Sequence, residues 1–226
     1  MAKYLRLVLR DGQPLFRSAR LVQRGEFLLR EENDGWSPFD ATHYASMQPP
    51  GFIWDASIHM APLMSVRVRD GYVAGQASMQ GKILSLATVV DEQSKPELNA
   101  GALQRYLAEA VWYPTALLPG AGVEWSAIDE KRALATLVDS STTVSLEFHF
   151  NDVGEVTGIF TPERYREVDG EYETAPWAGH FRRYEERDGM RIPLEGNVEW
   201  QLPDRVLSYW KGQIVEVEYE YGEGRR

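Results

Sequence analysis

The sequence predicts a mainly β protein: one large curved antiparallel sheet, or a half-open barrel, with a single helix packed on its concave side. Strand-like segments are separated by turn signals at roughly 8–12 residue spacing, which is typical of an antiparallel meander. Only one long stretch, residues 96–119, has the spacing of a helix. Strands and helices do not alternate, so a parallel sheet is not expected. With no low-complexity linker and no repeat, we predict one domain over residues 1–226, with the sheet spanning 19–221.

A short amphipathic helix is predicted at the N-terminus, within residues 1–11. Tyr4, Leu5, Val8 and Leu9 recur at helical spacing, and Asp11-Gly12 ends the pattern. We place the strands of the first half at 19–30, 35–47, 51–60, 63–69, 72–79 and 82–90. Asp70-Gly71 is a strong two-residue turn signal between two of them.

The central helix is predicted at about 97–113. Its apolar stripe repeats at i, i+3, i+4 and i+7, as in a helix packed on a core, and comprises Leu103, Tyr106, Leu107 and Ala110. Pro96 suits the first turn because its missing N–H has no partner at a helix start. Pro114 removes a hydrogen bond, so the helix ends near Tyr113.

Glu109 is the most informative residue of this helix because its neighbours in the last turns are apolar on every side. Such a turn is buried, and a buried carboxylate must be paired, hydrogen-bonded or protonated. Two interpretations stay open. Glu109 forms an exposed ion pair with Arg105, four residues earlier, or it faces an internal cavity and meets an arginine from a strand. A role as general acid or base is a third.

The second half reads as a run of strands. They are predicted at 123–128, 132–138, 142–150, 155–161, 177–186, 191–201 and 207–221. Alternation is clearest in 142–150, where one face carries Val144, Leu146, Phe148 and Phe150. Turns are expected around Asp129-Glu130, at 151–154, at Asp188-Gly189 and at Pro203-Asp204, and a loop is expected around Asp169-Gly170.

Composition excludes several classes of function. The formal net charge is −10 and no Lys/Arg cluster interrupts it, so we expect neither nucleic acid nor an anionic membrane surface as a partner. No cysteine is present, so disulfides and thiolate chemistry are absent. No apolar run approaches the ~18 residues of a membrane span. The N-terminal residues do not resemble a signal peptide, so a cytoplasmic location is expected.

Metal and cofactor motifs are absent as well. The four histidines are scattered without ligand spacing, and no phosphate-binding glycine loop or nucleophile elbow occurs. We therefore predict no metal, no cofactor and no catalytic residue. The candidates are instead ligand-binding residues.

A sheet of this size around one helix leaves an interior that side chains need not fill, which is a common origin of a ligand cavity. The 7 Trp and 11 Tyr suit the lining of such a cavity. We select as candidate lining residues Tyr44, Trp54, Tyr106, Trp112, Trp125 and Trp177. The polar anchor would come from Glu109 with Arg164 or Arg166. The alternative for the rings is core packing, and the alternative for the arginines is a solvated surface.

Several motifs resemble a family of uncharacterised bacterial proteins, a domain of unknown function. They are Pro49-Pro50-Gly51-Phe52-Ile53-Trp54-Asp55, Tyr106-Leu107-Ala108-Glu109 with Trp112-Tyr113-Pro114, and Ile192-Pro193 with Trp200. The family's architecture is similar to the half-barrels of lipoprotein carriers. This resemblance implies a half-barrel around a hydrophobic interior.

We therefore expect a non-enzymatic binder of a small hydrophobic or amphipathic molecule. The alternative is an enzyme that uses Glu109 as general acid or base beside an arginine. A structural protein whose interior is completely packed is the third hypothesis.

Overall fold

The computed structural model describes residues 1–9, 12–29, 35–62, 64–83, 87–92 and 94–222. Its helices are α1 (Ala2–Val8) and α2 (Pro96–Glu109), and short 3-10 turns follow α2: η2 (Ala110–Trp112), η3 (Pro114–Leu117) and η4 (Pro119–Ala121). The strands of the first half are β1 (Phe16–Leu28), β2 (Trp36–Ser46), β3 (Gly51–Ala61), β4 (Met64–Val73), β5 (Gln76–Ile83) and β6 (Ala87–Glu92). Those of the second half are β7 (Val123–Ala127), β8 (Arg132–Asp139), β9 (Thr142–Phe150), β10 (Val156–Val168), β11 (Glu171–Arg187), β12 (Met190–Gln201) and β13 (Val206–Tyr221).

In the described part of the chain, thirteen strands form one antiparallel sheet in the order β6-β5-β4-β3-β2-β1-β13-β12-β11-β10-β9-β8-β7. The sheet is therefore two meanders joined where the first strand pairs with the last. The chain leaves the first meander at the edge strand β6 and enters the second at the edge strand β7. Helix α2 makes that connection, so it must pass from one end of the sheet to the other.

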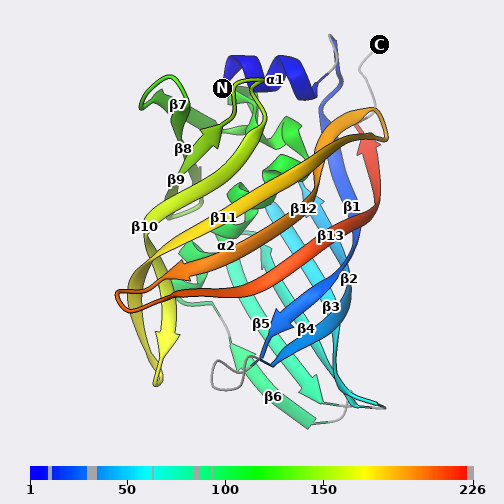
Figure 1. Cartoon of the computed structure of the whole chain (residues 1–226), viewed down its shortest axis with the longest axis vertical. Coiled ribbons are helices and arrows are strands. Elements are labelled where there is room, and N and C mark those ends of the chain that lie inside the picture. Colours follow the sequence, from blue (N-terminus) through cyan, green and yellow to red (C-terminus); the bar gives the residue numbers. More distant parts are fainter. Residues whose placement is uncertain (10–11, 30–34, 63, 84–86, 93, 223–226) are drawn as a thin grey trace.

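The sheet curls around α2. In Figure 1, strands β10–β13 cross one side of the molecule and β2–β5 lie on the other, with α2 between them. Helix α2 contacts β3, β4 and β5 on one wall and β9 and β10 on the opposite wall. Helix α1 lies across one end of the molecule and packs on β12. The predicted curved sheet with a helix on its concave side is confirmed.

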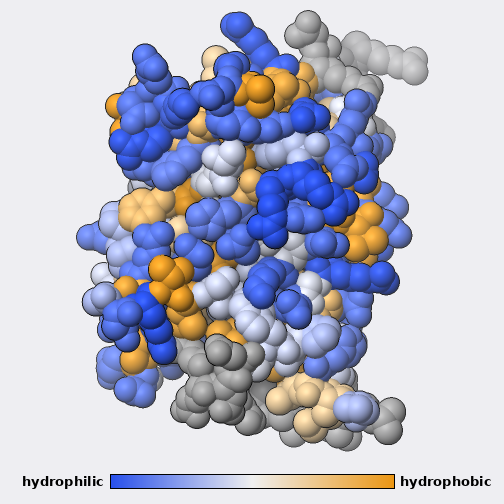
Figure 2. All heavy atoms as spheres, viewed as in Figure 1, coloured by the Kyte–Doolittle hydropathy of each residue, from blue (hydrophilic) through white to orange (hydrophobic). Residues whose placement is uncertain are grey.

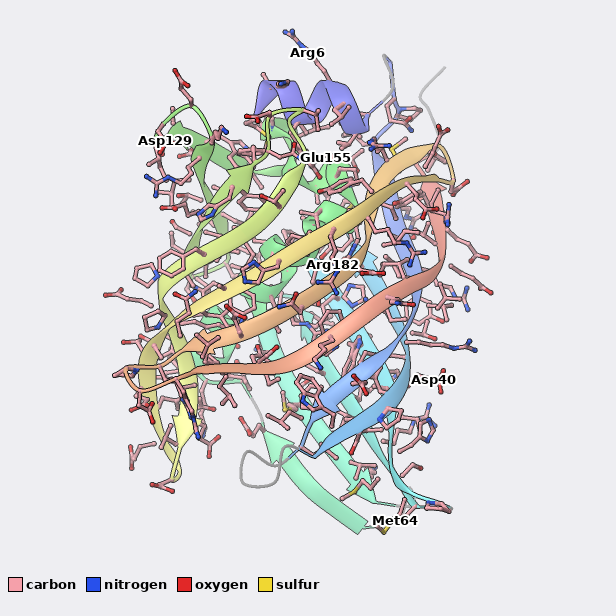
Figure 3. The ribbon with its side chains drawn as sticks, viewed as in Figure 1. Arg6, Asp40, Met64, Asp129, Glu155 and Arg182 are labelled. Atoms are coloured by element: carbon pink, nitrogen blue, oxygen red, sulfur yellow. The ribbon has the colours of Figure 1, made fainter. Side chains whose placement is uncertain are left out.

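Burial follows the strand alternation. In β9 the residues Val144, Leu146 and Phe148 are buried, as predicted. The opposite face of the sheet is polar: Figure 2 shows a largely hydrophilic surface over β10–β13, with small hydrophobic spots. Charged side chains such as Arg182 project from this outer face in Figure 3. One apolar face and one solvated face are what an antiparallel sheet of this kind requires.

The predicted helices are confirmed with small changes. Helix α1 ends at Val8; Arg10 and Asp11, on which the predicted stop partly fell, lie outside the described residues. Helix α2 begins at Pro96 and continues as the 3-10 turn η2 up to Trp112, next to the residue where Pro114 was expected to end it.

Asp70-Gly71 is not a turn, and this expectation was wrong. Strand β4 runs through both residues, and the turn follows at Ala74 and Gly75, which have φ of 52° and 81°. Gly71 lies at a close approach of two strands rather than in a turn, because a Cβ there would lie 3.1 Å from the carbonyl oxygen of Phe52. Asp70 is buried, and its partner is described below.

The stretch between 161 and 177 is also more regular than expected. Strand β10 continues to Val168 and β11 begins at Glu171, so the loop shrinks to the turn at Asp169-Gly170. The pairing of β10 with β11 shifts between Thr161 and Arg164. Pro162 lacks the N–H that a regular ladder needs, and a bulge accommodates it.

Candidate ligand-binding cavity

A cavity of about 610 Å³ lies between α2 and the two walls of the sheet. Its volume is within the range typical of small-molecule sites. Most of the lining is apolar and comes from Phe27, Leu29, Trp54, Ile58, Met60, Val66, Val68, Met79, Gly81, Ala108, Trp112, Ile159, Trp177, Phe181, Val198 and Trp210. The polar lining is Asp70, Arg105, Glu109, Arg164, Asn197 and Tyr209. The polar groups on α2 thus face a mainly hydrophobic chamber.

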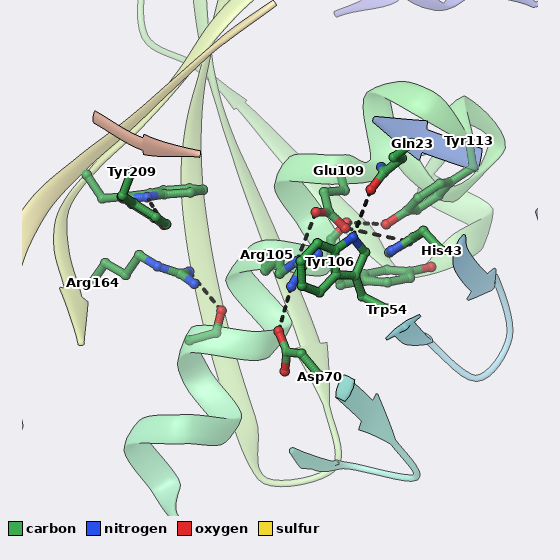
Figure 4. A network of polar contacts seen from close by, with 12 residues as sticks. Gln23, His43, Trp54, Asp70, Arg105, Tyr106, Glu109, Tyr113, Arg164 and Tyr209 are labelled. Carbon is green, nitrogen blue, oxygen red and sulfur yellow. Dashed lines mark hydrogen bonds and ion pairs between the residues drawn. The ribbon is translucent and has the colours of Figure 1, made fainter. Parts of the chain in front are cut away.

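Arg105 is the centre of the polar cluster in Figure 4. Its Nε donates to Glu109 Oε1 at 2.9 Å, and its Nη1 donates to Asp70 Oδ2 at 2.5 Å. The guanidinium carbon also lies 5.0 Å from the ring centre of Phe52 and 5.1 Å from that of Trp54. Burial opposes the charge of Arg105, but Glu109 and Asp70 together raise its pKa. One buried cation therefore serves two carboxylates from different elements.

The structure agrees in part with each of the first two interpretations of Glu109 given above. Its partner is Arg105 at i, i+4, yet the pair is buried: only 12% of the Glu109 side chain and 19% of the Arg105 side chain are exposed. Burial raises the pKa of Glu109, and the charge of Arg105 opposes that rise. No strand arginine forms an ion pair with Glu109 among the described residues. Its second oxygen, Oε2, has no hydrogen-bond partner within the same set.

His43 is a buried polar residue next to Glu109 that does not itself line the cavity. His43 is completely buried, and its Nε2 is 3.5 Å from Glu109 Oε2. Their geometry does not make a hydrogen bond, so both ring nitrogens of His43 lack a partner in the described part of the chain. Burial first, and then the positive charge of Arg105, hold the pKa of His43 well below its usual value. The ring therefore stays neutral and stacks on Phe52, with centroids 5.5 Å apart.

Gln23 connects this group to the lining. Its Oε1 accepts from Trp54 Nε1 at 2.9 Å, while its Nε2 has no partner among the described residues. The interaction fixes the Trp54 indole against the cavity. Gln23 is completely buried on β1, so an amide donor remains available in the interior.

Arg164 approaches from β10, on the opposite wall. Its Nη1 donates to the carbonyl oxygen of Gly101 in α2 at 2.7 Å, and its guanidinium carbon lies 4.5 Å from the ring centre of Trp177. Trp177 Nε1 in turn donates to the hydroxyl of Tyr209 at 2.9 Å. Figure 4 shows Arg164 and Tyr209 on the far side of α2 from the His43 group. Burial lowers the pKa of Arg164.

Five of the nine candidate ligand-binding residues line the cavity: Trp54, Glu109, Trp112, Arg164 and Trp177. The other four do not. Tyr44 is 50% exposed on the outer face of β2. Tyr106 is buried and its hydroxyl donates to the Ser46 carbonyl oxygen. Trp125 packs edge-on against Phe148 and donates to the Leu117 carbonyl oxygen. Arg166 lies over Trp200 and pairs with Glu173 at 3.8 Å.

The strand pattern explains why Tyr44 faces away from the cavity. Ala41, His43 and Ala45 face inward, so position 44 must face outward. Trp125 belongs to the edge strand β7, and no residue of β7 lines the cavity.

The candidate site also contains residues that sequence reasoning did not select. Asp70 was assigned to a turn, and His43 was considered only as a metal ligand. Gln23 and Tyr209 carried no motif. Strand alternation could have indicated that His43 is buried, because it lies on the same face of β2 as Ala41 and Ala45. Among the described residues, no three His, Cys, Asp or Glu side chains come together as a metal site would require, and no helix is long and apolar enough to cross a membrane.

Comparison with solved structures gives distant similarities. A LolA superfamily protein from Nitrosomonas europaea aligns over 98% of this chain and 92% of its own, with 8% identity and a TM-score of 0.39. A beta-barrel-like protein of the domain of unknown function DUF1849 from Brucella abortus aligns over 91% of this chain and 99% of its own, with 11% identity and a TM-score of 0.32. No curated protein sequence matches the chain significantly. Residues 1–219 match the profile of DUF6920, a family of unknown function, and the chain belongs to that family.

Proposed function

We propose that this protein binds a small hydrophobic or amphipathic molecule in the cavity beside α2, without catalysing a reaction on it. The observation that carries the proposal is the cavity of about 610 Å³ with a mainly apolar lining. Large apolar interiors are normally closed by packing, because each unfilled volume forfeits dispersion contacts. A cavity of this size beside a buried polar cluster is what a ligand site requires.

The lining supports a ligand with a long apolar part. Side chains from both meanders contribute, including Ile58 and Val68 from the first and Val198 and Phe181 from the second. An apolar guest removes this surface from water, at about 25 cal/mol per Å² buried. The polar groups on α2 and β10 then offer hydrogen bonds to one end of the guest.

An enzyme with Glu109 as general acid or base is the second candidate. It is supported by the raised pKa of Glu109 and by the absence, among the described residues, of a partner for its Oε2. The ion pair with Arg105 works against it, because it favours the ionised form and holds the carboxylate in place. That function would require a substrate whose turnover is abolished in Glu109→Gln while the fold is intact.

Filling the cavity provides the test. Val68 on β4 lines the cavity opposite Gly81, which has no side chain, so Val68→Trp has space to enter. We expect this variant to bind the neutral fluorescent probe N-phenyl-1-naphthylamine at least about tenfold more weakly than the parent, a loss of about 1.4 kcal/mol. Titration of probe fluorescence at equilibrium measures it.

The control lies on the same strand. Val73→Trp adds the same ring at a residue that is 57% exposed, so probe affinity should stay as in the parent. Absence of probe binding by the parent would contradict the proposed function. So would an equal loss of affinity in both variants, because the effect would then not come from the cavity.

A further inference from the structure

The two arginines in the cavity wall differ in their counter-charges. Arg105 has Glu109 and Asp70 at hydrogen-bond distance. Among the described residues, Arg164 has one hydrogen-bond partner, the carbonyl oxygen of Gly101, and no ion pair. A guanidinium carries five N–H donors and keeps its charge in proteins. Arg164 therefore brings a positive charge and unused donors to an apolar chamber.

Two contacts fix the orientation of the Arg164 guanidinium. The Trp177 ring lies 4.5 Å below the guanidinium carbon, and the bond to Gly101 fixes one nitrogen against α2. The hydroxyl of Tyr209 accepts from Trp177, which leaves its own proton available for donation, and Tyr209 lines the same cavity as Arg164. A stacked arginine beside a hydroxyl donor is a common arrangement for a carboxylate or a phosphate.

A purely structural role for Arg164 must be weighed against this. Arg105 and Arg164 carry two positive charges, and Asp70 and Glu109 carry two negative charges, so the four residues balance. Arg164 does act on the two carboxylates at a distance, since its charge lowers the pKa of both against the effect of burial. Long-range balance, however, uses the charge and leaves the donors unsatisfied. The other donors of Arg164 are not among the fully buried atoms without a partner, so they face the cavity, where a ligand can accept hydrogen bonds from them.

We infer that the ligand of this cavity is an amphiphile with one anionic headgroup, a carboxylate or a phosphate, which accepts hydrogen bonds from Arg164 while its apolar chain fills the chamber. This inference rests on the proposed function and specifies its ligand class. The headgroup adds a third anion to the cluster of four charged residues. The donors of Arg164 and Tyr209 are the groups that make its burial favourable.

A matched pair of probes tests the charge alone. 11-(Dansylamino)undecanoate and its methyl ester share the chain and the fluorophore and differ in the carboxylate. For the parent at neutral pH we expect the acid to bind at least about tenfold more tightly than the ester. In Arg164→Gln this preference should fall to about one, with the affinity for the ester within about twofold of the parent.

The control removes an arginine elsewhere. Arg182 lies on the outer face of β11 with 64% of its side chain exposed (Figure 3), and Arg182→Gln should keep the full preference for the acid. Equal affinity of the parent for acid and ester would overturn the inference and leave the hydrophobic cavity intact. An equal loss of preference in both arginine variants would do the same. No binding of either probe would instead contradict the proposed function itself.

A second variant covers misfolding of Arg164→Gln. Arg164→Lys keeps the positive charge but loses the planar pair of donors, so we expect a several-fold weaker affinity for the acid and no change for the ester. Unchanged affinity for the acid in that variant would overturn the inference. Displacement of the bound acid by hexadecanoate or by hexadecyl phosphate then distinguishes a carboxylate ligand from a phosphate ligand.

Discussion

The two sides of the 96–117 segment treat their polar groups differently. In the part of the core around η3 and β7, which does not border the cavity and is called the solid region below, ring N–H and O–H groups donate to backbone carbonyl oxygens. The hydroxyl of Tyr113 donates to the Tyr106 carbonyl oxygen at 2.9 Å and that of Tyr219 to the Trp112 carbonyl oxygen at 2.6 Å. Trp125 Nε1 donates to the Leu117 carbonyl oxygen at 3.0 Å. On the cavity side, Glu109 Oε2 and Trp210 Nε1 have no partner among the described residues.

This difference concerns how the buried polar groups of the two regions are satisfied. Buried polar groups that serve the fold are normally satisfied, and those left open need another explanation. Away from the cavity lining, the buried atoms without a partner among the described residues are the Tyr4 hydroxyl, Gln23 Nε2, both ring nitrogens of His43 and Gln104 Oε1. On the cavity side, Glu109 and Trp210 line the chamber, and their unpartnered atoms are buried just behind its surface. The comparison predicts that the two regions respond differently to the same chemical change.

The largest expected effect comes from truncating a phenylalanine on each side. Phe148 is completely buried in the solid region, and Phe148→Ala should lower the free energy of unfolding by about 3–5 kcal/mol. Phe181 is 7% exposed and borders the cavity, so it already lacks neighbours on one side. Phe181→Ala should cost about half as much. Urea unfolding followed by circular dichroism measures both, and equal losses would mean that the two regions are equally packed.

A smaller effect is expected from His43 and depends on pH. In the folded protein its pKa is held well below the ordinary value of 6.5. Below pH 6.5 the unfolded chain therefore binds a proton that the folded chain does not, and stability falls as the pH falls. At pH 5.5 one such group costs about 1.4 kcal/mol relative to pH 7.5. His43→Phe keeps a ring against Phe52 and removes this loss.

The measurement compares the parent with His43→Phe by urea unfolding at pH 7.5 and pH 5.5. Asp70 and Glu109 have raised pKa values, because of burial, and contribute with the opposite sign, since stability due to their protonated forms is lost as the pH rises. Both proteins contain these carboxylates, so the difference between them isolates the histidine. The same pH dependence in parent and variant would show that His43 is not the buried neutral base described above.

Much of the fold could be predicted because strand alternation and the single helical pattern are local signals. Periodicity placed the strand at 142–150 correctly. Periodicity and the two flanking prolines placed the helix at about 97–113, and the structure has α2 at Pro96–Glu109 followed by a 3-10 turn to Trp112. The partner of Glu109 was also predictable, since Arg105 lies four residues away on the same helix. Asp70 was not, because its contact with Arg105 joins strand β4 to α2 across 35 positions. Local turn chemistry at Asp70-Gly71 suggested a different conformation, and tertiary packing overrode it.

The cavity itself could not be predicted from local sequence patterns. Whether a chamber beside a helix is filled depends on how two meanders curve, and no single strand determines that. Trp54, Trp112 and Trp177 line the cavity, whereas Trp125 packs in the solid region, although all four are tryptophans within or next to predicted strands or the helix. That a tryptophan would be buried could be predicted from its residue type. Whether it would be buried against the cavity or against other core side chains could not.

The smallest expected effect concerns Tyr44, the neighbour of His43 on β2. The two residues lie on opposite faces of one strand, with His43 completely buried and Tyr44 50% exposed. Tyr44→Ala removes a large ring from the outer face, so we expect a change of no more than about 0.5 kcal/mol in the free energy of unfolding. Binding of N-phenyl-1-naphthylamine should be unchanged. A loss comparable with that of Val68→Trp would mean that the outer face of β2, and not the chamber beside α2, holds the probe, since this ring and the chamber share no surface.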